Sequence, residues 1–345
     1  MTAPFLLRAG SFSFFVYQRV LLVQCLLFFL LAALCLHGLM SGSNLLTWQD
    51  VTGWMAGNGL APLPAKILID IRLPVVLTAL GVGGCLGAAG AVFQSVSRNS
   101  LGSPDILGFT SGAATGAVYH LVFISQSPAG VAGFAFLGGC FTALVIYLFA
   151  IKGQVLQTGR LVLVGIGTGA TLTAFTGLLL VKGDIDNAML ANLWLLGSLD
   201  GRQWGHVFTV MAGLFTGLPV LMLLAKSLRL TEMGDAVAFG LGVNVQLSRH
   251  AGLAISVLMV SLATAAAGPM AFIALGAPHI ARALTGLSLP LFTSSLCGAV
   301  LLLTANRVSA VLPLVSQLPA GRVTAILGGV YLIVLLLRQH KKGAF

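Results

Sequence analysis

Charged residues are scarce in this chain of 345 residues: Asp, Glu, Lys and Arg together make up only 8% of it. Soluble domains carry roughly 25% charged residues, so this chain cannot cover a surface that faces water. Hydrophobic residues make up 58% of the sequence, the mean hydropathy is +1.02, and the apolar runs extend from residue 20 to residue 337. The composition therefore predicts a single transmembrane domain over residues 1–345, with no separate soluble domain.

Nucleotide-binding and catalytic motifs are absent. No Gly-Lys dipeptide occurs, so there is no G-x-x-x-x-G-K-[ST] phosphate loop, and neither H-E-x-x-H nor G-x-S-x-G is found. The five cysteines stand in apolar stretches without C-x-x-C spacing, so they are interpreted as small packing residues and not as metal ligands. We therefore expect no enzyme activity, no cofactor and no metal site in this chain.

Residues suited to ion coupling are also missing. No Asp or Glu falls inside a clean apolar run, whereas ion-coupled transporters usually hold an ionisable residue at mid-membrane. Unwound backbone carbonyls could bind sodium instead, so a secondary transporter with a broken-helix site around 268–282 stays an alternative. The net charge of +10 is attributed to orientation in the membrane and contact with anionic lipid, and not to nucleic acid.

Ten apolar runs are candidate spanning helices, because a span needs about 20 apolar residues. They predict an all-α, polytopic membrane fold of about ten transmembrane helices, with a retained first span after a cytoplasmic N-terminal segment, 1–19. Gly, Ser or Pro interrupts the third and the eighth runs, which is tolerated only inside protein or beside a cavity. The runs are 20–40, 73–95, 106–125, 129–151, 161–181, 205–225, 250–267, 270–286, 288–305 and 322–337.

The distribution of basic residues predicts the orientation. If the N-terminus is cytoplasmic, twelve of the 18 Lys and Arg residues lie on inner segments and six on outer segments. This asymmetry follows the positive-inside rule and places both termini in the cytoplasm. The basic C-terminal residues Arg338, Lys341 and Lys342 agree with that placement.

Small residues at four-residue spacing indicate close helix contacts. Gly83 and Gly87 in the second run, and Gly165 and Gly169 in the fifth, fit the G-x-x-x-G pattern. The fifth run is also the most polar of the clean runs, which suits a central helix beside a pathway. Hydroxyls that bond to carbonyls of their own helix explain its threonines equally well. These threonines are Thr168, Thr171, Thr173 and Thr176.

Three polar segments stand out, at 98–105, 226–250 and 268–282. The longest, 226–250, predicts two short helices broken at Gly240 and Gly242, with Asp235 capping or starting the first. An inner loop of this length is long for a connector, so a docking segment and a plain surface loop both stay open. His279, in the third segment, is interpreted as a buried structural hydrogen-bonding residue.

At these segments the chain resembles the permease subunits of bacterial ABC importers for iron–siderophores, haem and cobalamin. The matching motifs occur in order along nearly the whole length, and SLGSPDILGF, EMGD and GGVYLIVLL are most similar to the second permease subunit of ferric-enterobactin importers. The motifs are RLP at 72–74, Gln94, RNSLGSPD at 98–105, WLLGSL at 194–199 with Trp204, EMGD at 232–235, LGV at 241–243, PHIAR at 278–282 and QLPAG at 317–321.

The resemblance implies a ten-helix subunit of an importer in the bacterial inner membrane. Its expected partners are a paralogous permease that completes a heterodimer, two cytoplasmic ATPase subunits that bind ATP and Mg, and a periplasmic substrate-binding protein. The implied cargo is a ferric siderophore, with ferric enterobactin or a related catecholate first. Another siderophore, haem or cobalamin is the alternative within the family.

The same resemblance implies roles for individual residues. The cytoplasmic segment 226–249 would couple to the ATPase, Asn99, Leu101 and Thr158 would form the cytoplasmic gate, and a group of outer basic residues would receive Glu side chains of the binding protein. The coupling residues would be Arg229, Glu232, Met233, Gly234, Asp235, Leu241 and Gly242, and the docking residues Arg72, Lys66 and Arg307.

Two departures from the family's pattern bear on these roles. Ser100 replaces the Pro of the usual R-N-P-L motif, which predicts a less rigid gate loop. Val75 replaces the second Arg of R-L-P-R, which weakens the expected docking pattern, and Arg307 could supply a replacement charge.

Overall fold

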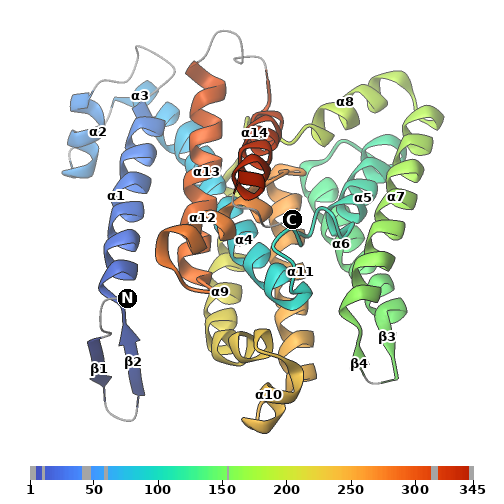
Figure 1. The fold of residues 1–345 in the computed structure, drawn as a ribbon. Helices are drawn as coiled ribbons and strands as arrows, with labels where there is room; N and C mark the ends of the chain where they lie inside the picture. Colours follow the sequence, from blue (N-terminus) through green and yellow to red (C-terminus); the bar gives the residue numbers. More distant parts are fainter. Residues whose placement is uncertain are drawn as a thin grey trace.

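The computed structural model describes residues 5–9, 12–40, 48–57, 61–153, 155–311 and 318–341 (Figure 1). Gln317 of the QLPAG motif and Lys342 of the C-terminal basic run lie outside the described residues. The helices are α1 (Gln18–Met40), α2 (Trp48–Met55), α3 (Pro62–Lys66), the π-helical turn η1 (Ile67–Arg72), α4 (Leu73–Ser97), α5 (Phe109–Phe123), α6 (Pro128–Ala150), α7 (Thr158–Lys182), α8 (Ile185–Leu195), α9 (Trp204–Glu232), α10 (Asp235–Gly240), α11 (Val245–Ala267), α12 (Ile273–Thr285), α13 (Leu291–Val311) and α14 (Ala320–Lys341).

Each predicted apolar run coincides with a helix of the structure. Within the described residues, seven helices are long and apolar enough to cross a membrane. The helices α5 and α12, which match the two interrupted runs, have only 15 and 13 residues. The number of ten crossings and the cytoplasmic location of both termini therefore stay predictions. The seven helices span Gln18–Met40, Pro62–Ser97, Pro128–Ala150, Thr158–Lys182, Trp204–Glu232, Val245–Ala267 and Leu291–Ala310.

Two short antiparallel hairpins supplement the helices. Strands β1 (Phe5–Ala9) and β2 (Phe12–Val16) pair with each other, and β3 (Ile151–Lys152) pairs with β4 (Val155–Leu156) between α6 and α7. The prediction of an all-α fold is confirmed for the long apolar helices, and the two short hairpins depart from it.

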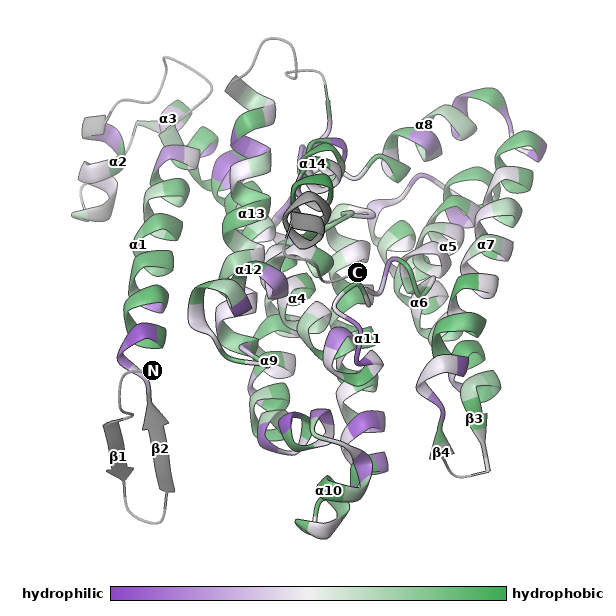
Figure 2. Cartoon of the chain, viewed as in Figure 1, coloured by the Kyte–Doolittle hydropathy of each residue, from purple (hydrophilic) through white to green (hydrophobic). Residues whose placement is uncertain are grey.

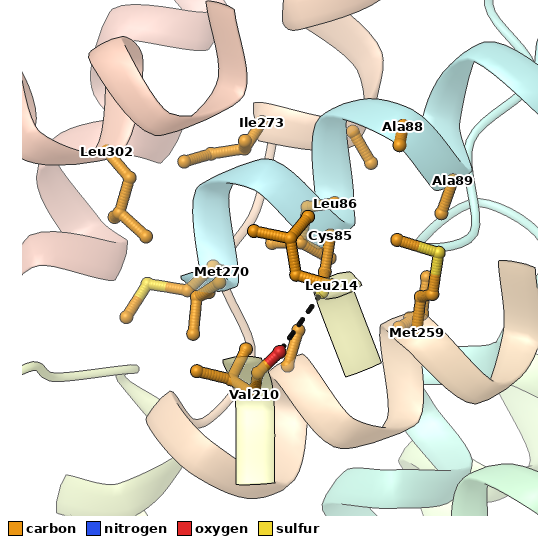
Figure 3. Packing of buried hydrophobic residues seen from close by; sticks show 14 of the residues in the cluster. Cys85, Leu86, Ala88, Ala89, Val210, Leu214, Met259, Met270, Ile273 and Leu302 are labelled. Atoms are coloured by element: carbon orange, nitrogen blue, oxygen red, sulfur yellow. Dashed lines mark hydrogen bonds between the residues drawn. The ribbon is translucent and has the colours of Figure 1, made fainter. Parts of the chain in front are cut away.

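Helix α4 forms the centre of the subunit, because its small residues let other backbones approach. A Cβ added at Gly87 would lie 2.2 Å from the Ser294 carbonyl oxygen of α13, and one at Gly90 would lie 1.8 Å from the Ala274 oxygen of α12. The predicted close contact of the second run is thereby confirmed. Figure 3 shows the surrounding core, in which the Cys85 thiol of α4 points to the Val210 carbonyl of α9.

Short elements lie at the two ends of the long helices, and many of the hydrophilic residues also lie toward those ends (Figure 2). Helix α10 and both hairpins lie at one end of the molecule, and α2, α3 and α8 lie at the other (Figure 1). The first set contains the segments predicted to be cytoplasmic, and the second set contains segments predicted to be outside. Helix α8 has 11 residues and is too short to span a membrane.

Candidate functional site

The segment predicted to couple to an ATPase folds into one short helix between two long ones. Helix α9 continues to Glu232, Gly234 has a φ of +122°, α10 runs from Asp235 to Gly240, and Gly242 has a φ of +79°. These positive φ angles favour glycine and permit two sharp turns within nine residues. The first of the two predicted short helices is α10, which ends at the predicted break at Gly240. The prediction of a second short helix was wrong, because the residues after Gly242 lead into the long helix α11 (Val245–Ala267). Asp235 starts α10, as expected, but does not cap it.

Three large apolar side chains in and beside α10 are exposed. Phe239 is 78% exposed, Met233 69% and Leu241 61%. Apolar side chains gathered on one exposed turn are typical of a surface that binds another protein. Phe239 escaped the sequence analysis, although an aromatic residue in a six-residue helix between glycine turns was a usable signal.

Two hollows at this end of the molecule are lined in part by predicted coupling residues. One, of about 530 Å³, is lined by Asp235, Phe239 and Gly242 with the start of α11. The other, of about 880 Å³, lies between the end of α9, the start of α1 and the loop before α13, and it is lined by Arg229, Glu232 and Met233 among others. The coupling residues thus do not converge on a single point.

Asp235 accepts hydrogen bonds from two arginines. Arg249 of α11 is bidentate, with Nη1 2.9 Å from Oδ2 and Nη2 2.6 Å from Oδ1, and Arg98 Nη2 also donates to Oδ1. Burial raises the pKa of the Asp235 carboxyl, but the hydrogen bond and charge of Arg249, with the charge of Arg98, outweigh it and lower the pKa below its ordinary value. The carboxylate is therefore charged at neutral pH. Neither arginine was singled out from the sequence for this role.

The predicted gate residues Asn99 and Leu101 lie in one turn directly after α4. The Leu101 amide donates to Asn99 Oδ1 at 3.0 Å, and the Leu101 side chain is exposed. Thr158 is the first residue of α7, and among the described residues no hydrogen bond joins it to Asn99 or Leu101. The structure brings two of the three gate residues together.

A second polar contact links α4 to the interrupted eighth run. Phe272 has a φ of +72°, so α12 begins only at Ile273. Gln94 Nε2 donates to the Leu275 carbonyl at 3.0 Å, and Gln94 Oε1 accepts from Arg282. The ring of His279 stands edge-on to Tyr331, with centroids 5.8 Å apart. At the break itself Met270 and Ile273 are buried, whereas Ala271 is exposed in this subunit.

The predicted docking residues lie at the opposite end of the molecule and differ in exposure. Lys66 is exposed, whereas Arg72 is buried and donates from Nη1 to the Leu39 carbonyl at 2.5 Å. Arg307 Nη1 lies 3.5 Å from the Gly38 carbonyl, close enough to Arg72 for their charges to interact. Both guanidinium groups therefore face the last carbonyls of α1, where a helix end attracts cations.

Metal-binding groups are not found in the described part of the chain, which holds no group of three His, Cys, Asp or Glu residues that could share an ion. All five cysteines are free thiols. Two of them, Cys85 and Cys297, are buried packing residues, as predicted.

Comparisons with known proteins bear on the whole chain. The model of the FecCD transport family matches residues 27–338. The ferric enterobactin transport system permease protein FepG of Escherichia coli is 41% identical over 94% of this chain and 98% of its own length. The Fe(3+) dicitrate transport system permease protein FecD of Escherichia coli is 35% identical over 90% of this chain and 96% of its own. A solved inward-facing structure, described as an ABC transporter of metal-chelate type, superposes with a TM-score of 0.81 at 26% identity, covering 92% of this chain and 99% of that one.

Proposed function

The chain belongs to the FecCD transport family, and from this premise we propose that it is one half of the translocation path of an ATP-driven importer for a ferric siderophore. Its relatives are transport permeases and not enzymes, so separate ATPase subunits would bind ATP and Mg. A paralogous permease would complete the path, and a periplasmic protein would deliver the cargo. The chain is accordingly a multi-pass protein of the bacterial inner membrane.

The observation that carries the proposal is full-length similarity to a permease, combined with an exposed helix at one end. Membrane crossing alone does not explain the turns at Gly234 and Gly242 or the exposed Phe239, whereas contact with a cytoplasmic partner does. We propose that α10 seats in a groove of the ATPase. Helix α9, with 29 residues, precedes α10 by one short turn, and α11, with 23 residues, follows it after another. A force on α10 would therefore tilt both long helices as rigid bodies.

Ferric enterobactin or a related catecholate is the proposed cargo. The higher identity to FepG than to FecD favours a catecholate over dicitrate. Another siderophore, haem or cobalamin is the alternative within the same family.

Deletion of the gene tests the cargo directly. We expect cells without it to lose growth when ferric enterobactin is the sole iron source and to keep growth on haem or ferric dicitrate. Loss of growth on one of the latter sources alone, with enterobactin use intact, would reassign the cargo and leave the importer proposal standing.

Charge reversal on the coupling segment tests the role of α10. Changing Glu232→Lys together with Asp235→Lys should abolish uptake while the protein still inserts in the membrane. The segment would lose its negative charges, and Asp235 would lose the bonds to Arg98 and Arg249 that hold the start of α10. Wild-type uptake by this variant would refute the coupling role. Purification in mild detergent should also recover an ATPase and a second permease with the wild-type chain.

We further propose that Lys66 makes the first contact with the binding protein at the outer end. It is the exposed member of the three predicted docking residues, while Arg72 and Arg307 hold the end of α1 in place. Lys66→Glu should therefore slow capture of the loaded binding protein, measured as the concentration of that protein needed for half-maximal uptake.

A further inference from the structure

The end of α4 has a backbone conformation that its sequence does not favour. Arg98 ends the helix with φ 50° and ψ 33°, in the left-handed region. The amide of Asn99 reaches back to the Gln94 carbonyl at 3.2 Å, which is the helix ending that normally places glycine at the left-handed position. A residue with a Cβ is strained there. The side chain of Arg98 must therefore make contacts that offset the strain.

Those contacts reach the coupling segment. Arg98 Nη2 donates to the Thr231 carbonyl of α9 at 2.6 Å and also to Asp235 Oδ1 at the start of α10. The Arg98 side chain thus bridges the two sides of the turn between α9 and α10. The gate residues Asn99 and Leu101 follow Arg98 directly in the sequence, so the same residue starts the gate turn and holds the coupling helix.

The partner on the other side of the carboxylate is fixed. Arg249 has a side chain only 4% exposed, whereas Arg98 is 41% and Asp235 49% exposed. A bidentate bond from a buried guanidinium is well ordered, and its loss would leave an unpaired buried charge. Arg249 therefore anchors Asp235 to α11, and the exposed Arg98 contact is the one that can be changed without disturbing the interior.

We propose that Arg98 is the positioning residue that joins the coupling segment to the cytoplasmic gate, with the Asp235 carboxylate as the shared joint. When α10 moves, Asp235 moves with it, and Arg98 carries the displacement into the turn that holds Asn99 and Leu101. This inference rests on the proposed function, since it assigns a path for the motion that an ATPase would drive.

A glycine at position 98 separates this role from a purely structural one. Arg98→Gly suits the left-handed turn, so the end of α4 should keep or gain stability, but the link to Asp235 and Thr231 is lost. In proteoliposomes that contain the whole importer, we expect ATP hydrolysis to persist while uptake per ATP falls about tenfold. Arg98→Lys, which keeps a cation in reach of Asp235, should recover part of that loss.

Two controls are matched to this test. Arg160→Gln removes another exposed arginine at the same end of the molecule, at the start of α7, and should leave uptake per ATP unchanged. In a double-mutant cycle, Arg98→Gln and Asp235→Asn should together cost no more than Asp235→Asn alone, because Asp235→Asn already removes the Arg98 contact. Arg98→Gln and Glu232→Gln should be additive.

The outcomes are distinct. Uptake per ATP at the wild-type level in Arg98→Gly overturns the inference, and so does a parallel loss of assembly or ATP hydrolysis, because that would show a structural role only. The proposed function fails separately, if the wild-type complex itself shows no uptake that depends on ATP.

Discussion

Helices α4 and α7 both have 25 residues and both are rich in glycine, yet α4 is buried inside the subunit and α7 is mostly exposed. In α4, 83% of the most apolar stretch is buried inside the protein, whereas in α7 the share is 22%. Glycines of α4 face the backbones of α12 and α13, while Gly167 and Gly177 of α7 have open space beside them. Figure 1 shows α4 inside the bundle and α7 at its edge.

The difference shows that glycine content alone does not mark a central helix. In α4 the glycines admit other backbones to close range, and the helix ends in the contact with the coupling segment. In α7 the glycines leave a face open, and its threonines bond to their own helix, with Thr171 and Thr173 reaching the Gly167 and Gly169 carbonyls at 2.9 and 2.8 Å. Helix α7 thus lies at the edge of this subunit, and the place of the fifth run beside a pathway stays a prediction.

The largest effect is expected from alanine at matched glycines of the two helices. Gly90→Ala would place its Cβ 1.8 Å from the Ala274 carbonyl oxygen, so it should destabilise the fold by about 3 kcal/mol. Gly177→Ala meets nothing within 4 Å and should be neutral or stabilise by about 0.5 kcal/mol. Thermal unfolding in detergent measures both changes in stability. Equal changes would show that glycines of α4 and α7 do not differ in how closely they are packed.

A buried amide on α4 should matter more than an exposed one on α7. Gln94→Leu removes the contacts with Arg282 and the Leu275 carbonyl and should cost about 2 kcal/mol of unfolding free energy. Gln157→Leu, at the exposed start of α7, should change stability by less than about 0.5 kcal/mol. A stable Gln94→Leu variant would show that the link between α4 and α12 does not hold the fold together.

Within α7, one threonine should behave as a packing residue and its neighbour should not. Thr176 is buried and its hydroxyl lies 2.8 Å from that of Thr115 on α5, so Thr176→Val should cost about 1 kcal/mol. The exposed Thr173 bonds only to the Gly169 carbonyl among the described residues, so Thr173→Val should have no measurable effect on the melting temperature. A larger loss of stability in Thr173→Val than in Thr176→Val would show that Thr173, and not Thr176, lies on the face of α7 that packs against the rest of the protein.

The smallest effect near neutral pH is expected where α4 meets α10. The pKa of Asp235 is lowered from its ordinary value of 3.8, so its contribution to stability is complete above that value and is lost as pH falls through the lower, folded-state pKa. The difference in melting temperature between wild type and Asp235→Asn should stay constant from pH 8 to about pH 5 and shrink only below about pH 4. A difference that disappears by pH 6 would show that Asp235 is not held by its arginines.

Sequence reasoning found the parts of this molecule that local patterns determine. The apolar runs became helices, and Gly83 and Gly87 contact α13 as their spacing predicted. Gly165 and Gly169 also make a close contact, but with Leu107 and Gly108 in the loop before α5 and not with a helix. The G-x-x-x-G pattern predicts that another backbone segment approaches the helix closely, but it does not identify that segment.

The contacts that organise the candidate site could not be predicted in this way. Arg98 and Asp235 are 137 positions apart, and only the packing of α4 beside α9 and α11 makes them neighbours. The burial of Arg72 depends equally on where the end of α1 lies. Pairings of this kind are set by the tertiary fold and leave no spacing in the sequence.

Measuring which energy source drives uptake tests most directly whether this chain forms the path of an ATP-driven importer. Uptake of a ferric siderophore should be measured in vesicles that hold the permease with its partners, once after ATP depletion and once with an ionophore that collapses ion gradients. Uptake should stop without ATP and should continue with the ionophore. Uptake that continues without ATP but stops with the ionophore would contradict this role and favour an ion-coupled transporter with a site at the break between α11 and α12.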